Sequence, residues 1–310
     1  MKKLQWLISL IFILSLITTA VDIGIIQILE HPALDAARAG FMDELKEQGI
    51  NATYDYQNAQ GDMATLYTIA GNIVADKVDL ILAIATPSAQ AAANATSQIP
   101  ILITAVTDPK IAGLVKEFDK PGTNVTGTSD MNPVEKQLEL ILSFAPKATR
   151  IGIIYNGGEA NSVVQIDLAQ QAAKKLGLKL VLVTVSETSG VFQATQSLQG
   201  RVDAVYVPTD NTVVAALESV ISFCERNKLP LIAGETESVE RGALATIGLN
   251  YYDLGRQTGA MAVKILNGAD PAETPIEFQE NINLTVNKSA AKRMGFTIPD
   301  EILKEAIVVE

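Results

Sequence analysis

The chain has 310 residues, of which 48% are hydrophobic and 19% charged, a composition typical of a globular α/β protein long enough for two domains. Its formal net charge of −11 argues against a general affinity for nucleic acid or for anionic membrane surfaces. The chain has one histidine, His31, and one cysteine, Cys224, which exclude a disulfide framework and argue against a His/Cys metal site. No metal or cofactor is therefore predicted, and Cys224 is expected to pack in a core.

The first 20 residues have the pattern of an export signal. Met-Lys-Lys is followed by the apolar run LQWLISLIFILSLITTA, which ends in small residues that suit a cleavage site. The run is short for a membrane span, which needs about 20 apolar residues. Cleavage after Ala20 would leave almost no linker, so residues 1–20 are predicted to be either a signal peptide or an N-terminal anchor. Both alternatives predict an extracytoplasmic protein, whether periplasmic, secreted or membrane-anchored.

Apolar runs of strand length alternate with helix-period segments from residue 23 onward. Strands are predicted at IGIIQI (23–28), ATYDY (52–56) and VDLILAIA (78–85). Helices are predicted at 33–49 and 63–77, where apolar residues recur at helical spacing. This βαβα order, with continuously apolar strands, predicts a parallel sheet covered by helices on both faces.

The second half of the chain repeats this plan. IGIIYN (151–156) matches IGIIQI at an offset of 128, and VDAVYV (202–207) matches VDLILA at an offset of 124. KLPLIAGETESV (228–239) matches QIPILITAVTDP (98–109) at an offset of 130. Three strands in the same order at a nearly constant offset predict an α/β fold with two similar, doubly wound parallel-sheet lobes.

Polar loops follow six of the predicted strands, three in each lobe. In open parallel sheets, ligands bind beyond the carboxyl ends of the strands, where helix N-termini point at the crevice. Two facing lobes would place all six loops around one cleft, although His31 could equally cap the next helix. The predicted ligand-binding residues are Glu30, His31, Thr86, Ser88, Thr107, Asp108, Glu159, Asn161, Ser162, Asp210, Asn211 and Glu235.

The motifs of common catalytic sites are absent from the sequence. Neither half opens with G-x-G-x-x-G or G-x-x-x-x-G-K-[ST], and there is no G-x-S-x-G elbow. Carboxylates such as Asp108, Glu159, Asp210 and Glu235 could do acid–base work, but nothing pairs them with a nucleophile or a metal. The sequence therefore predicts binding without catalysis.

Several long stretches of the chain carry a resemblance to a known family. They are GALATIGLNYYDLGRQTGAMAVKILNG (242–268), INLTVNKSAAKRMGFTIPDEIL (282–303), EHPALDAARAGF, YDYQNAQGDM, DLILAIATPSAQAAAN, TAVTDP, NVTGTSDMNPVEKQLELI and YNGGEANSVVQ. Over residues 23–305 the chain resembles the solute-binding proteins of bacterial ABC importers related to tryptophan- and tyrosine-binding lipoproteins. The resemblance implies a type I periplasmic-binding fold, with two lobes, three hinge crossings and one ligand enclosed on closure.

The resemblance also implies where the chain changes lobe. Crossings are expected in 124–130, near 245–250 and near 282–287, with Gly127 and Gly248 supplying backbone freedom. The helix GRQTGAMAVKILNG would then return to the N-terminal lobe. The implied lobes comprise residues 21–127 plus 249–281 and residues 128–248 plus 282–310.

An amino-acid ligand would need donors for its carboxylate and an acceptor for its ammonium group. Two helix N-termini could serve the carboxylate, together with Thr86, Ser88, Asn161 and Ser162, and Asp210 is the predicted partner of the ammonium. Which aromatic residues line the pocket stays open between Tyr67, Phe118, Tyr155 and Tyr206.

The predicted function is capture of an aromatic or other apolar amino acid for an ABC permease, by a monomer without nucleic-acid partners. Three alternatives stay open: a regulatory protein built on the same core, a receptor that signals at the membrane, and an α/β enzyme for a sugar or phosphate ester. The first would need a basic headpiece, which the N-terminus does not provide. Family members are often lipoproteins, but no cysteine follows the signal here, which argues against lipid anchoring.

Overall fold

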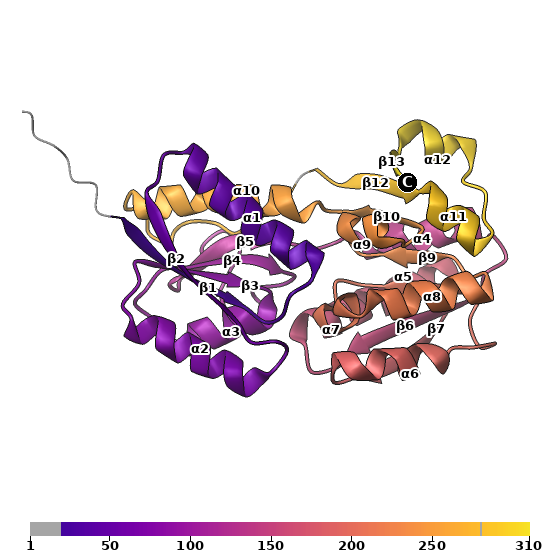
Figure 1. Ribbon diagram of the computed structural model, residues 1–310, viewed down its shortest axis with the longest axis horizontal. Helices are drawn as coiled ribbons and strands as arrows, with labels where there is room; N and C mark the ends of the chain where they lie inside the picture. The colour runs from indigo at the N-terminus through magenta and orange to yellow at the C-terminus, as the bar shows by residue number, and fades with distance from the viewer. Residues whose placement is uncertain (1–19, 280) are drawn as a thin grey trace, which may run out of the picture.

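The computed structural model describes residues 20–279 and 281–310, so the predicted signal or anchor falls outside it except for Ala20. These residues form two lobes that lie side by side (Figure 1). Within the described ranges, no helix has both the length and the apolar character needed to span a bilayer.

The N-terminal lobe is built on a six-stranded sheet in the order β11-β5-β4-β3-β1-β2, with every pairing parallel. Its helices pack against the faces of this sheet (Figure 1). In chain order the elements are β1 (Val21–Gln27), α1 (Pro32–Glu47), β2 (Ala52–Asn58), α2 (Met63–Ala75), β3 (Leu80–Ile84), α3 (Thr86–Ala95), β4 (Ile101–Val106), β5 (Val125–Ser129), α10 (Tyr251–Leu266) and β11 (Glu277–Phe278).

The C-terminal lobe has a seven-stranded sheet in the order β13-β12-β10-β9-β8-β6-β7, in which only the β10–β12 pair is antiparallel. A 3-10 turn at Thr188–Gly190 precedes α6. The elements are α4 (Val134–Phe144), β6 (Arg150–Asn156), α5 (Ala160–Leu176), β7 (Lys179–Val185), α6 (Val191–Gln196), β8 (Ala204–Val207), α7 (Asn211–Ala215), α8 (Leu217–Asn227), β9 (Leu231–Ala233), α9 (Thr236–Arg241), β10 (Ala245–Gly248), β12 (Asn283–Asn287), α11 (Lys288–Met294), α12 (Asp300–Glu305) and β13 (Ile307–Val309).

Each lobe has its own hydrophobic core, so the prediction of two doubly wound parallel-sheet lobes is confirmed. The strands β1, β3 and β4 supply the centre of the first core, and β6, β8 and β9 that of the second. Cys224 is fully buried in the second core, as predicted. This arrangement explains why the strands are apolar at every position: helices cover both faces of a parallel sheet, so neither side of a strand is exposed to water.

The repeated Val-Asp pair has the same structural role in both lobes. Asp79, just before β3, accepts a hydrogen bond from the backbone N–H of Asp22 in β1 at 2.9 Å. Asp203, just before β8, accepts from the backbone N–H of Arg150 at 2.9 Å and forms an ion pair with its guanidinium at 2.7 Å. Each aspartate thus ties the start of one central strand to its neighbour. The guanidinium holds the pKa of Asp203 well below its usual range.

Helix α10 packs on the N-terminal lobe although it follows β10 of the C-terminal lobe in the chain. It lies beside α1 at a distance that only glycine permits (Figure 1). A Cβ atom on Gly255 would lie 2.0 Å from the Ala37 carbonyl oxygen, and one on Gly40 would lie 2.1 Å from the Tyr252 carbonyl oxygen. Such contacts are shorter than any non-bonded pair, so side chains at these two positions would force the helices apart.

The chain passes between the lobes three times, after β5, after β10 and after β11. The implied boundary at residue 127 falls inside β5, which pairs with β11 as far as Ser129. Gly127 accordingly lies within the sheet and not in a connecting segment. Its φ of +141° is one that L side chains rarely adopt, and a Cβ there would lie 2.2 Å from the Ile103 carbonyl oxygen.

Candidate functional site

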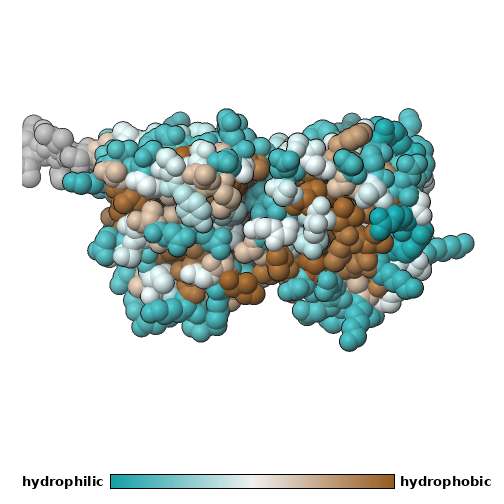
Figure 2. All heavy atoms as spheres, turned by 90° about the horizontal axis from the view of Figure 1, so that it is seen from below, coloured by the Kyte–Doolittle hydropathy of each residue, from teal (hydrophilic) through white to brown (hydrophobic). Residues whose placement is uncertain are grey.

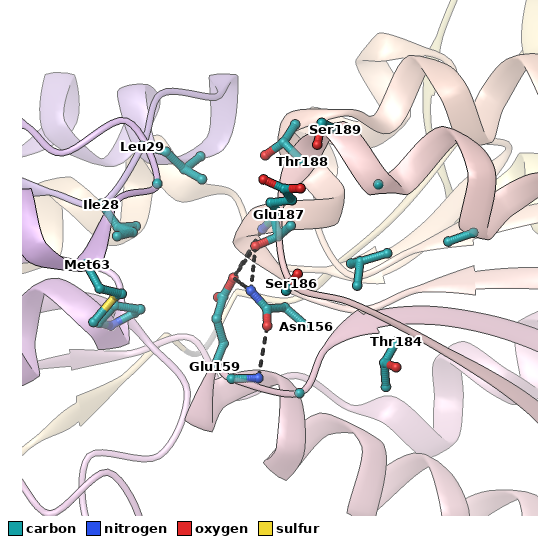
Figure 3. A pocket seen from close by; sticks show the side chains of 18 of the residues that line it. Ile28, Leu29, Met63, Asn156, Glu159, Thr184, Ser186, Glu187, Thr188 and Ser189 are labelled. Carbon is teal, nitrogen blue, oxygen red and sulfur yellow. Dashed lines mark hydrogen bonds between the residues drawn. The ribbon is translucent and has the colours of Figure 1, made fainter.

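The carboxyl ends of both parallel sheets face the space between the lobes. Viewed from below, the molecule shows a notch there with apolar side chains around it (Figure 2). This outer groove is lined on one side by Ile28, Leu29 and Met63, and on the other by Asn156, Glu159 and the segment 183–190 (Figure 3). The groove is broad and open to solvent, so it resembles an entrance more than an enclosing site.

A smaller space, the interlobe cavity, lies between the lobes and has a volume of about 10 Å³, which is roughly what one water molecule requires. Ligand pockets in proteins have volumes of roughly 300–1,000 Å³. The lobes must therefore lie further apart than here when they hold a ligand. The lining residues of the cavity are His31, Ala33, Leu34, Ala105, Asp130, Asn161, Thr209, Asp210, Asn211, Val214, Glu235 and Tyr251.

His31 both caps a helix and faces the cavity. Its Nδ1 accepts a hydrogen bond from the Leu34 N–H at the start of α1, at 3.5 Å. Burial lowers the pKa of His31 to about 3, with Arg241 contributing and the Asn211 side chain opposing the shift. The ring is therefore neutral near pH 7, and because Nδ1 accepts, its proton lies on Nε2. Within residues 20–279 and 281–310, the buried Nε2 has no hydrogen-bond partner of good geometry, so it can donate to a ligand.

Thr86 and Ser88 lie in the first turn of α3. This helix begins at Thr86, so its N-terminus lies within the segment ATPSA (85–89) and not after that segment. Both side chains are buried and neither hydroxyl has a partner among the described residues. The residue before them, Ala85, has a φ of +75°, which is a strained conformation for alanine. Neither Thr86 nor Ser88 is among the lining residues of the cavity.

Asp210 is the most deeply buried acid of the C-terminal lobe, with 0% of its surface exposed. It caps α7 by accepting the Val213 N–H at 2.8 Å, and its other oxygen accepts from the Asn156 N–H and the Ser162 hydroxyl, both at 2.6 Å. Burial, with the Glu159 carboxylate nearby, raises the pKa of Asp210 to about 7. Three donors hold this carboxyl in place at the cavity wall.

Glu159 links the outer groove to the cavity. It lines the groove, and it accepts hydrogen bonds from two cavity residues, Asn211 Nδ2 at 2.5 Å and Asn161 Nδ2 at 3.2 Å. Asn161 Nδ2 also donates to the Thr209 carbonyl at 3.0 Å, and the buried Oδ1 of Asn161 has no hydrogen-bond partner among the described residues. An unpaired buried acceptor at the cavity wall is a position where a ligand donor would be stabilising.

A second acidic group lies at the end of the cavity nearest the crossings. Asp130, which follows β5, accepts from the Thr107 hydroxyl at 2.9 Å and from the Tyr251 hydroxyl. Glu235 caps α9 and accepts from the Ser238 N–H at 2.7 Å, while Glu237 accepts the Tyr251 N–H at 2.8 Å. Burial raises the pKa of all three carboxyls.

The cavity wall is acidic. Three carboxyls line it, from Asp130, Asp210 and Glu235, and no lysine or arginine is among its lining residues. The nearby Arg241 is held by Glu218 at 2.8 Å and by the Val214 carbonyl. Buried carboxylates without a cation are costly, which agrees with the raised pKa values of these groups, and a positively charged ligand group would offset that cost. No cluster of acids, histidine or cysteine within 20–279 and 281–310 has the arrangement of a metal site.

The structure brings only part of the predicted ligand shell to the cavity. Five of the twelve residues line it: His31, Asn161, Asp210, Asn211 and Glu235. Three lie directly behind as hydrogen-bond partners of lining groups: Thr107, Ser162 and Glu159.

Two predicted residues face elsewhere. Glu30 is exposed and accepts from the Tyr56 hydroxyl at 3.0 Å. Asp108 caps its own turn by accepting the Lys110 N–H at 2.9 Å. In both cases the carboxylate is oriented by a hydrogen bond outside the cavity, to β2 for Glu30 and within its own turn for Asp108.

Sequence reasoning missed Asp130 and Tyr251. Both adjoin chain crossings, and their proximity to the implied hinge segments was the signal that could have identified them. The four candidate aromatic residues do not line the cavity: Tyr206 is buried and donates to Gln137 at 2.6 Å, Phe118 packs on Phe278, Tyr67 is 49% exposed, and Tyr155 is half-buried.

Comparison with known proteins finds matches over nearly the whole described chain. The profile of a family described as ABC transporter substrate binding protein matches residues 22–310. A tyrosine-binding protein of Clostridioides difficile (strain R20291) is 46% identical over 277 residues, which is 88% of this chain and 80% of that protein. More distant solute-binding proteins of ABC transporters share the fold, which confirms the type I periplasmic-binding arrangement that the resemblance implied.

Two solved structures indicate the state of the lobes. An ABC domain from Streptococcus pneumoniae in complex with L-Trp is 38% identical, with a TM-score of 0.90 over 94% of this chain and 100% of that one. A ligand-free, open substrate binding protein with adhesive properties from Clostridium difficile is 48% identical, covers 94% and 99% of the two chains, and has a TM-score of only 0.70. The relative with the higher sequence identity has the lower TM-score, so the arrangement of the lobes here is closer to that of the L-Trp complex than to that of the ligand-free, open structure.

Proposed function

The chain belongs to the ABC transporter substrate-binding protein family, and from this we propose that it captures one aromatic amino acid by closing its two lobes around it. Proteins of this family are extracytoplasmic and work with the permease of an ABC transporter, whose ATPase resides in other subunits. The observation that carries the proposal is the enclosed acidic cavity between the lobes. The tyrosine and L-Trp partners of two relatives support an aromatic ligand.

The cavity offers the groups that an amino acid requires. Asp210 and the unpaired Oδ1 of Asn161 suit an ammonium group, and the Nε2–H of His31 suits a carboxylate. The side chains of Ala33, Leu34 and Val214 add an apolar wall for the ligand side chain. The ligand would contact both lobes at once, so its binding favours the closed state by differential affinity.

The direct test is calorimetry on residues 21–310 after unfolding and refolding, which removes any ligand carried from the host. We expect saturable one-to-one binding of an aromatic amino acid, and a smaller radius of gyration by X-ray scattering when that ligand is present. No heat with any amino acid would remove the amino-acid assignment and keep the family and the fold. Recovery of unaltered ligand after prolonged incubation would support our expectation that the protein does not catalyse a reaction.

We expect ligand affinity to fall as the pH is lowered below about 7. Burial, together with the nearby Glu159 carboxylate, raises the pKa of the Asp210 carboxyl from 3.8 to about 7. Because this pKa is raised, protonation of Asp210 stabilises the closed, ligand-free form at low pH. This stabilisation is lost as the pH rises from about 4 to about 7. The ammonium group needs the ionised carboxylate and must displace the proton. Affinity should therefore be full above pH 7 and fall by up to about tenfold per pH unit below it.

The measurement is calorimetry from about pH 5.5 to 7.5 in two buffers with different ionisation heats, which reports protons released on binding. His31 stays neutral throughout this range because its pKa is about 3. The Asp210→Asn variant should show weaker binding and a flatter pH profile. A wild-type affinity that is constant across the range would show that no proton on Asp210 competes with the ligand.

The remaining features of the proposal concern the whole molecule in the cell. We propose that the protein acts as a monomer, since one chain supplies both walls of the cavity. We also propose that residues 1–20 direct export without a lipid, because the only cysteine is the buried Cys224. Mass spectrometry of the protein from its native host would show whether this segment is removed.

A further inference from the structure

The segment 28–31, which follows β1, contributes side chains to both spaces between the lobes. Ile28 and Leu29 lie on one wall of the outer groove (Figure 3), and His31 lines the interlobe cavity. The segment is neither helix nor strand, so its position depends on bonds to the elements around it. What holds these four residues therefore determines where the ring of His31 points.

Each residue of the segment is held by a hydrogen bond from a residue outside it. The bonds run from Gly61 N–H to the Ile28 carbonyl at 2.7 Å, from Gln27 Nε2 to the Leu29 carbonyl at 2.8 Å, from the Tyr56 hydroxyl to the Glu30 carboxylate at 3.0 Å, and from Leu34 N–H to His31 Nδ1 at 3.5 Å. Of the two side-chain donors, Gln27 is fully buried, whereas Tyr56 is half-buried and its partner Glu30 is exposed. The bond from Gln27 is therefore the better shielded from competing water.

Gln27 is the last residue of β1, and its amide is held in one orientation. Its Nε2 donates a second hydrogen bond to Asp35 at 2.9 Å, and its Oε1 accepts from Arg38 Nη1 at 2.6 Å. Arg38 also forms an ion pair with Asp35 at 3.1 Å and lies over the Tyr56 ring at 4.0 Å. Turning the amide over would set its oxygen against the Leu29 carbonyl and the Asp35 carboxylate, so this network excludes the other orientation.

The hydrophobic core alone does not account for an amide at this position. An apolar side chain of the same size would be buried at a lower cost in desolvation. Two of the bonds of Gln27, to Asp35 and Arg38, fix its amide to α1, and the third fixes the Leu29 carbonyl to the amide. The segment is thereby tied to the same helix that His31 caps.

We infer that Gln27 is a positioning residue of the ligand site, whose amide holds the segment 28–31 so that the His31 ring faces the interlobe cavity. This inference rests on the proposed function, in which Nε2 of His31 donates to the carboxylate of the ligand. Hydrogen bonds weaken steeply when their angle is lost, so a displaced ring would lose this bond. A hydrogen bond to a charged group contributes roughly 10- to 100-fold in affinity, and Gln27 would govern that contribution without touching the ligand.

Amide hydrogen exchange measured by NMR tests the position of His31 without any ligand. The Leu34 N–H bonds to His31 Nδ1 and the Asp35 N–H to the His31 carbonyl at 3.1 Å, so both amides report where His31 lies. In Gln27→Met, we expect both to exchange at least 10-fold faster relative to the amides of Leu80–Ile84 in β3, which report the stability of the lobe core. A relative rate that changes by less than threefold would overturn the inference.

Calorimetry with the ligand identified for the wild type tests whether the effect on binding passes through His31. His31→Ser removes the ring and keeps a good N-cap residue on α1. We expect Gln27→Met to weaken binding by roughly 10-fold in the wild-type background, and by less than threefold in the His31→Ser background. An equal loss in both backgrounds would show that Gln27 does not act through the ring.

Two further variants complete the test. Gln57→Met makes the same substitution at an exposed position on the neighbouring strand β2, and should change neither measurement. If Gln27→Met does not refold, Gln27→Glu replaces it, because glutamate keeps the size of the side chain and the bond from Arg38 but lacks the N–H groups. Absence of binding by the wild type would overturn the proposed function, whereas the exchange measurement would still decide whether Gln27 holds the segment.

Discussion

Replacing Gly127 by alanine is expected to lower the free energy of unfolding of the N-terminal lobe by about 3–5 kcal/mol. The φ of +141° at this position is strained for any L side chain, and the new Cβ would lie 2.2 Å from the Ile103 carbonyl oxygen and 2.6 Å from the Ile103 nitrogen. Both neighbours are backbone atoms of β4, so relief requires that β4 and β5 separate. The loss would be a large part of a typical domain stability of about 5–15 kcal/mol.

Urea denaturation followed by circular dichroism measures this change, and Gly71→Ala is the matched control. Gly71 is an exposed residue of α2 around which a Cβ would meet no atom within 4 Å. Alanine there should raise stability by about 0.5–1 kcal/mol, because it removes the entropy cost of glycine in a helix. If Gly127→Ala lost less than about 1 kcal/mol, the close approach of the two strands would not depend on glycine.

Replacing Asp210 by asparagine is expected to weaken ligand binding by about 100-fold. The variant removes the negative charge that we propose pairs with the ammonium group in a buried, water-poor site. Asparagine is as good a helix N-cap as aspartate, so the bond to the Val213 N–H at the start of α7 can be kept. The Asn156 N–H and the Ser162 hydroxyl would meet a neutral partner, so a moderate fall in Tm is expected as well.

Calorimetry with the ligand identified for the wild type, together with a thermal melt of each variant, separates binding from folding. Asp167→Asn, an exposed aspartate on α5 of the same lobe, removes the same charge from the chain away from the cavity. It should keep wild-type affinity. Affinity within about threefold of wild type in Asp210→Asn would remove Asp210 from the ligand contacts.

The architecture could be read from the sequence because the signals for it are local. Apolar runs such as those of β1 and β6 and helix-period segments such as α1 lie close to the predicted ranges, and the nearly constant offsets between the two halves indicated two lobes. Strand-end loops also follow from local signals, since a polar segment after a buried parallel strand has to emerge at the sheet edge. Five of the predicted residues reach the cavity for this reason.

The lobe boundary shows where local signals stop being sufficient. The segment 124–130 was implied as a crossing, but Val125–Ser129 is a strand that completes the N-terminal sheet between β4 and β11. Its residues pair with segments far away in the chain, and the pairing partner β11 follows about 150 positions later. The close approach of Gly127 to Ile103 is likewise a property of the assembled sheet.

The sequence by itself determined the two-lobed parallel plan and the loops from which a site could be built. These features depend on hydrophobic periodicity and on polar residues at strand ends, which are properties of residues close together in the chain. The tertiary structure decided which polar groups meet. Asp130 and Tyr251 are 121 positions apart and share a hydrogen bond only because the crossings lie side by side. The tertiary structure also decided the charge of site residues, since burial raises the pKa of Asp210 and lowers that of His31. Burial depends on what the facing lobe covers, and no short segment of sequence contains that information.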